Sequence, residues 1–124
     1  MSRRERQKGA RGERDLRDLF LAHGFAARRD GRLDADLVHD LPGVHVECKR
    51  QETLLIPKWL RQVRDEAGQL VPALFFRRSR EPWQVIVPAD HYLELQQAAR
   101  ELEQRLDPLD RDTRAKLRAL DRTG

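Results

Sequence analysis

The segment Val44-His45-Val46-Glu47-Cys48-Lys49 carries the clearest structural signal in this chain of 124 residues, because apolar and polar residues alternate along it. Strict alternation is typical of a β-strand that has one face on a core. The first, third and fifth residues, ending with Cys48, should therefore face inward. His45, Glu47 and Lys49 should share the opposite face, where a carboxylate and an ammonium lie side by side.

A second carboxylate, Asp36, precedes this strand. Residues 35–39 (Ala-Asp-Leu-Val-His) are a short strand candidate, and residues 41–43 (Leu-Pro-Gly) predict a turn that folds the chain back. We therefore expect Asp36 to join the Glu47 carboxylate from a neighbouring strand. Asp34 lies two positions earlier on the same strand face and competes for that role.

The length of the chain predicts one domain with a single core. Charged residues make up 37% of the sequence and aromatic residues 6%, so we expect a modest core and an ionic surface. We find no apolar run of about 18 residues and no apolar N-terminal stretch of the signal-peptide type. We therefore expect a cytoplasmic protein with no membrane partner, located in the host cytoplasm if a phage encodes it. The lone Cys48 cannot form an internal disulfide and is expected to be a small core residue.

Positive charge is concentrated at the start of the chain. Residues 1–14 contain six Lys or Arg against two Glu, a surplus equal to the net charge of +4 of the whole chain. Clustered cations release counterions from nucleic acid when they bind it. We interpret residues 1–8 as a basic arm that contacts phosphates; the alternative is a disordered tail that aids solubility.

A first helix is predicted from Gly9 to His23, with Leu16, Leu19 and Phe20 on one stripe. Glu13 lies seven positions before Phe20 and therefore falls on nearly the same, buried stripe. A buried carboxylate is costly without a cation or hydrogen-bond donors. We expect Glu13 either to pair with an internal Arg or to contribute to a metal site.

The middle of the chain predicts strands at residues 25–28, 71–76 and 83–87, with Pro57 opening a helix that runs to about Ala67. The last two strands are nearly continuous in apolar residues, as buried central strands are. Beyond Pro88 we expect amphipathic helices, the second of them starting at Asp107-Pro108. Their candidate packing positions are Leu93, Leu95, Leu102, Leu106, Leu109, Leu117 and Leu120. This tail would pack on the domain or contact a second copy of the chain.

Together these features resemble the PD-(D/E)XK nuclease superfamily and, within it, the archaeal-type Holliday junction resolvases, including the short versions that phages carry. The resemblance covers about residues 8–95. It rests on the basic N-terminus, Lys8-Gly9-Ala10-Arg11-Gly12-Glu13, Ala35-Asp36, Val46-Glu47-Cys48-Lys49, and a later helix bearing Gln62. The resemblance implies an α/β fold with a restriction-endonuclease-like core, a central mixed β-sheet flanked by helices. The implied nuclease domain spans residues 9–96, and residues 97–124 form an added C-terminal helical segment.

The resemblance also implies a Mg²⁺-dependent endonuclease that nicks four-way DNA junctions in recombination and repair. Asp36 and Glu47 offer the hard oxygen ligands that suit Mg²⁺, for which Mn²⁺ can substitute, and the backbone carbonyl of Cys48 lies beside them. Lys49 would orient the attacking water or stabilise the charge of the transition state. Glu13 would hold a second ion or a metal-bound water. Hydrolysis would leave a 5′ phosphate, and no small-molecule cofactor is expected.

The sequence departs from the resolvase pattern at two points. Ala35 replaces the proline that precedes the metal-binding aspartate, a change that removes no ligand. The loop at residues 28–34 lacks the serine that these resolvases tend to carry there, so that role is absent or falls to another residue. We prefer Asp36 to Asp34 because the apolar residues that follow Asp36 resemble the apolar strand of the family.

Ten residues are candidates for DNA contact: Arg3, Arg4, Arg6, Lys8, Arg11, Arg28, Arg29, Arg50, Lys58 and Gln62. Ordinary solvated surface is the alternative for each. Trp59 and residues 54–56 would form a dimer surface or a wedge against DNA bases, or else pack in the core. The histidines and Cys48 show no recognised zinc spacing.

A four-way junction is two-fold symmetric and needs two nicks, so a homodimer is expected. Two rival hypotheses remain at this point. One is another PD-(D/E)XK nuclease that acts in repair, nicking or restriction. The other is a non-catalytic DNA-binding protein of the same fold.

Overall fold

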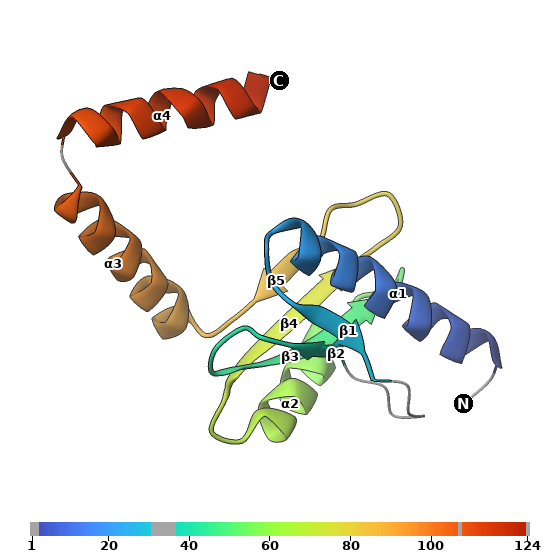
Figure 1. The fold of residues 1–124 in the computed structure, drawn as a ribbon. Helices are drawn as coiled ribbons and strands as arrows, with labels where there is room; N and C mark the ends of the chain where they lie inside the picture. The colour runs from blue at the N-terminus through green and yellow to red at the C-terminus, as the bar shows by residue number, and fades with distance from the viewer. Residues whose placement is uncertain (1–2, 31–36, 107, 124) are drawn as a thin grey trace. The chain divides into compact units, whose positions relative to one another are not determined.

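The computed structural model describes residues 3–30, 37–106 and 108–123. The helices and strands, in chain order, are α1 (Arg3–Ala22), β1 (Ala27–Arg29), β2 (Leu37–His39), β3 (Val44–Arg50), α2 (Ile56–Ala67), β4 (Val71–Arg77), β5 (Gln84–Ile86), α3 (Ala89–Arg105) and α4 (Pro108–Thr123) (Figure 1). The chain divides into two units, one up to Pro88 and one from Ala89 onward. Among the described helices, none has the length and apolar character needed to cross a membrane.

The first unit contains two small sheets. β1 and β2 form an antiparallel pair, while β3, β4 and β5 form a mixed sheet in which β4 is central. β3 and β4 run parallel, and β5 returns antiparallel to β4. A parallel pair requires a crossover connection, which α2 supplies here. The expected α/β architecture with a mixed sheet flanked by helices is thus confirmed.

The β3–β4 pair separates two apolar cores, and α1 and α2 lie on its two sides (Figure 1). Leu16 and Phe20 of α1 pack with Leu37 and Val46 in the first core. The second core joins α2 to the other face of the sheet. It contains Trp59, Val63 and Leu74, with Leu54 and Ile56 packed against them. Of the three uses considered for Trp59, core packing is therefore the one that the structure shows.

The ends of the two helices in the first unit were predicted with different success. α2 carries Pro57 in its first turn, as predicted, and gives way to Gly68, whose positive φ of 58° favours glycine. α1, in contrast, begins at Arg3 and not at the expected Gly9. The preceding Arg, Glu, Gln and Lys residues are good helix formers, so the helix continues back through them. The expected separate arm at residues 1–8 is therefore largely the first part of α1.

The partners of two strands differ from the expectation. β2 pairs with β1, and the described part of β2 shares no ladder with β3, although Leu37 and Val46 meet in one core. The turn before β3 does form, with Gly43 at a φ of 70°. β5 lies at the edge of its sheet, with Val85 exposed, so the prediction of a buried central strand was wrong there. An apolar run alone does not distinguish an edge strand from a central one.

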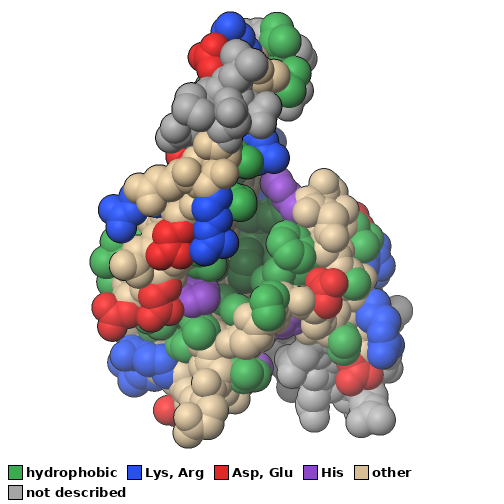
Figure 2. Space-filling view, turned by 60° about the vertical axis from the view of Figure 1, so that its left-hand side comes forward, with side chains coloured by type: hydrophobic (Ala, Val, Ile, Leu, Met, Phe, Trp, Pro, Cys, Tyr) green, Lys and Arg blue, Asp and Glu red, His purple; other side chains and the backbone are tan. Residues whose placement is uncertain are grey.

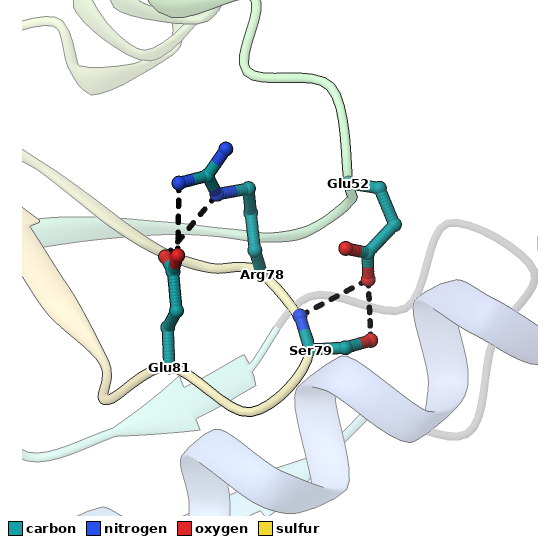
Figure 3. Close-up of polar contacts among 4 residues, drawn as sticks. All are labelled: Glu52, Arg78, Ser79 and Glu81. Carbon is teal, nitrogen blue, oxygen red and sulfur yellow. Dashed lines mark hydrogen bonds and ion pairs between the residues drawn. The ribbon is translucent and has the colours of Figure 1, made fainter.

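A polar connection ties together two loops of the first unit (Figure 3). The backbone N–H of Ser79 donates to Glu52 Oε1 at 3.0 Å, and the Ser79 hydroxyl donates to the same oxygen. These bonds lower the pKa of the Glu52 carboxyl. Arg78 forms a two-bonded ion pair with Glu81, at 3.2 and 2.8 Å, which braces the turn that leads to β5.

The second unit consists of α3 and α4, and its start at Ala89 differs from the expected boundary at residue 97. α4 begins at Pro108, as predicted. Five of the expected packing positions are more than half exposed in the single chain: Leu93, Leu95, Leu102, Leu117 and Leu120. Their contact with a second copy of the chain stays a prediction. No residue of α3 is buried. Figure 2 shows hydrophobic side chains open to the surface beside acidic and basic ones.

Gly12 of α1 lies close to β3, with no room for a side chain. A Cβ added there would lie 2.9 Å from the Cβ of Arg50. We predict that Gly12→Ala destabilises the protein by about 1–3 kcal/mol, because the added methyl group overpacks this contact. Chemical denaturation monitored by circular dichroism measures the change.

Gly9→Ala is the matched control, since Gly9 lies in the same helix and a Cβ there would meet nothing within 4 Å. It should stabilise the protein by roughly 0.5–1 kcal/mol through helix propensity. Equal effects of the two substitutions would contradict the close packing of α1 on β3.

Candidate metal centre

The two faces of β3 lie in different environments. Val46 and Cys48 face α1 and belong to the first core, as the alternation predicted. On the other face, Glu47 lies beside Leu74 and Lys49 beside Phe76 in the parallel ladder. Leu74 and Phe76 belong to the core under α2, so the polar face of β3 is directed toward this helix.

Glu47 and Lys49 lie side by side on this polar face. Lys49 Nζ lies 3.5 Å from Glu47 Oε1, and the two side chains are only 19% and 13% exposed, respectively. The ammonium also lies over the ring of Trp59, 5.9 Å from its centroid. A partly buried ion pair is less screened by solvent than a surface pair, and the aromatic ring restricts the ammonium further.

α2 brings a further carboxylate, Glu66, to the same place. One ligand atom from each of His45, Glu47 and Glu66 can be chosen so that all lie within 4.8 Å of one another. His45 Nε2 is 3.4 Å from Glu66 Oε2, and Gln62 donates a hydrogen bond of 3.1 Å to Glu66 Oε1. Burial acts to raise the pKa of Glu66, but its hydrogen bonds with Gln62, Glu47 and His45 outweigh this and lower it.

Two carboxylates and an imidazole are a donor set that divalent cations accept in proteins. This cluster therefore fits a divalent metal ion by its chemistry. His45 shares the strand face of Glu47, as the alternation along β3 predicts, whereas Glu66 was not among the predicted site residues. The available signal was the position of Glu66 one helical turn after Gln62, on the helix that crosses from β3 to β4.

Glu13 lies on the other side of the sheet. It is placed by α1, its side chain is 18% exposed, and it accepts a hydrogen bond of 2.9 Å from Arg29 Nε. Of the two expected roles, the structure shows the pairing with an internal Arg. The structure does not bring Glu13 into the group formed by His45, Glu47 and Glu66.

Asp36, together with Asp34 and Ala35, falls outside the described residues. The predicted convergence of Asp36 with Glu47 therefore stays a prediction. Leu37, the first described residue of β2, is buried in the same core as Val46 of β3.

The candidate DNA contacts fall into three groups. Arg11, Arg28 and Lys58 are exposed, and Gln62 is half-buried beside Glu66. Arg29 and Arg50 each form an ion pair with an α1 carboxylate; Arg50 Nε lies 3.3 Å from Asp15 Oδ2. The side chains of Arg3, Arg4, Arg6 and Lys8 lie outside the described set.

The reactivity of the Cys48 thiol reports whether this side chain is buried in the first core. Burial raises the pKa of its thiol to about 12, and the carboxylates of Glu13 and Glu47 add to the rise. The thiol is therefore protonated at neutral pH, and the thiolate is the reactive form.

We predict that a disulfide reagent such as DTNB labels Cys48 far more slowly at pH 8 in the native protein than in urea. Equal rates in the two conditions would contradict the burial of this side chain.

An α/β core that carries Glu47-x-Lys49 on a strand beside a crossover helix is the arrangement that the resemblance to the PD-(D/E)XK superfamily implies. A family model described as "Phage putative PDDEXK endonuclease" matches residues 4–112. The chain belongs to this phage PDDEXK endonuclease family. Searches of curated proteins and of solved structures gave no match.

Proposed function

We propose that this protein is a Mg²⁺-dependent endodeoxyribonuclease that nicks four-way DNA junctions. The observation that carries the nuclease assignment is the side-by-side placement of Glu47 and Lys49, 3.5 Å apart under α2, in a chain of the PDDEXK endonuclease family. The junction assignment is supported by the resemblance to archaeal-type resolvases in the order of Glu13, Asp36, Glu47 and Lys49.

In this proposal Asp36, Glu47 and the Cys48 carbonyl hold Mg²⁺, or Mn²⁺ in its place. The ion, when bound, supplies neutralising charge for the scissile phosphate and lowers the pKa of a bound water. Lys49 meets the charge that develops on the phosphate, or orients the water. Glu47 and the Trp59 ring hold the Lys49 ammonium for that task. Glu13 would take part in the reaction only after leaving its ion pair with Arg29.

A four-way junction requires two symmetric nicks, and each chain supplies one site. The proposed working unit is therefore a homodimer, which binds branched DNA in the cytoplasm of the host cell. Phosphate contacts would fix the junction geometry without reading base sequence. Arg11, Arg28 and Lys58 are exposed and suited to such contacts, whereas Arg29 and Arg50 would first have to leave their carboxylate partners.

A substrate panel tests the proposal. The protein, with Mg²⁺ or Mn²⁺, should nick a labelled synthetic four-way junction and leave linear duplex largely intact. Asp36→Asn and Glu47→Gln should each lower the cleavage rate at least a hundredfold while junction binding is kept or tightened, because both remove negative charge near phosphate. Denaturing gels measure cleavage, and mobility shifts measure binding.

Asp18→Asn is the control, since this exposed α1 carboxylate pairs with Arg17 at the surface. It should cleave like the unsubstituted protein. If the protein cuts duplex, flaps and junctions at comparable rates, the assignment as a resolvase is wrong and another nuclease of this superfamily is the better assignment. Binding without cleavage in either metal would leave a non-catalytic DNA-binding protein.

The basic start of α1 generates a separate prediction. Alanine in place of Arg3, Arg4, Arg6 and Lys8 keeps the helix and removes four cations. Junction binding should weaken, and its dependence on salt should flatten, because fewer counterions are released. The matched control removes four cations from α4 at Arg111, Arg114, Lys116 and Arg118. An unchanged salt slope in the first variant would assign the basic residues of α1 to solubility alone.

A further inference from the structure

We propose that His45, Glu47 and Glu66 form a divalent-cation site on the α2 face of β3 that prefers Mn²⁺ to Mg²⁺. The inference extends the proposed function, on which it rests through the shared ligand Glu47. It adds two ligands, His45 and Glu66, that the PD-(D/E)XK motif does not contain.

The first support is geometric. An ion of this kind is bound at about 2.1 Å, so the ligand atoms around it lie about 3 to 4 Å apart. His45 Nε2 and Glu66 Oε2 are already 3.4 Å apart, and the chosen atoms of all three side chains lie within 4.8 Å. Small side-chain rotations are therefore enough to close the three donors around one ion.

The second support is electrostatic. One carboxylate oxygen of Glu47 and one of Glu66 lie within 4.8 Å of each other, and two negative charges this close repel each other unless a cation lies beside them. Lys49 supplies one positive charge, on the Glu47 side. Glu66 is also the penultimate residue of α2, where the helix dipole presents negative charge. The site therefore attracts a further cation.

The third support is the neighbour that orients Glu66. Gln62 lies one turn earlier in α2 and donates to Glu66 Oε1 at 3.1 Å. Hydrogen bonds of this kind fix metal-ligating carboxylates and raise metal affinity. Gln62 thus has a role that needs no contact with DNA.

The donor types indicate which metal binds. Mg²⁺ prefers an all-oxygen shell, whereas an imidazole nitrogen suits first-row transition metals; Mn²⁺ is the weakest binder of that series but accepts nitrogen more readily than Mg²⁺ does. His45 would therefore select Mn²⁺ in competition with Mg²⁺, and its replacement should reduce this selectivity.

The experiment measures Mn²⁺ binding to the full chain without DNA, by electron paramagnetic resonance of free Mn²⁺ and by calorimetry. His45→Ala and Glu66→Gln should each weaken Mn²⁺ binding at least tenfold. Asp65→Asn is the matched control, because it removes an exposed carboxylate next to Glu66 and should leave the affinity unchanged. Circular dichroism and urea titration verify that each variant is folded.

A competition titration tests the selectivity. Mg²⁺ should displace Mn²⁺ from the unsubstituted protein only at large molar excess, and at a smaller excess from His45→Gln. Undiminished Mn²⁺ affinity in both His45→Ala and Glu66→Gln would overturn the inference, as would displacement by equimolar Mg²⁺.

The failure of this site and the failure of the proposed function are distinguishable. If Mn²⁺ binds as expected but no DNA is cut, the cation site stands and the nuclease assignment falls. If junctions are nicked while both ligand variants bind Mn²⁺ normally, the cation site is wrong and the nuclease assignment stands.

Discussion

The parallel pairing of β3 with β4 is the constraint on which the rest of the first unit depends. A parallel pair needs a crossover element, and α2 fills that role on one face while α1 covers the other. Alternate side chains of β3 therefore enter two different layers. Val46 and Cys48 complete an apolar core, whereas Glu47 and Lys49 lie under α2, where a charge must find a partner. Glu47 and Lys49 form an ion pair with each other, the Lys49 ammonium lies over the Trp59 ring, and Glu66 lies beside Glu47.

The same division places Glu13 and Glu47 on different sides of the β3–β4 sheet. The helical stripe placed Glu13 correctly on the buried side of α1, but a stripe does not show which face of the sheet the helix covers. α1 packs against the face of β3 that carries Val46 and Cys48, so Glu13 reaches Arg29 of β1 while Glu47 points toward α2. The sequence of a strand predicts which residues lie on each of its two faces. Which helix covers each face depends on the topology of the fold.

Local signals in the sequence predicted much of the fold, and tertiary contacts account for what they missed. Pro57 marked the first turn of α2, and the alternation along β3 gave its two faces. The apolar run at β5 was misassigned because its burial depends on a neighbour that the described sheet lacks. Glu66 was missed for a similar reason: it lies twenty-one positions from His45, and only the crossover brings the two together. Residues that a crossover connection brings together cannot be recognised from their spacing along the chain.

The position of Glu47 also bears on whether its cluster serves stability or chemistry. In the ladder it lies beside Leu74, which is completely buried, and Lys49 lies beside Phe76. Apolar side chains there would extend the second core without the cost of removing two charges from water. Replacement of a buried ion pair by apolar residues is often neutral or stabilising, so this pair contributes little that packing could not. The charges are therefore better explained by the proposed binding of a cation and a phosphate than by the fold that surrounds them.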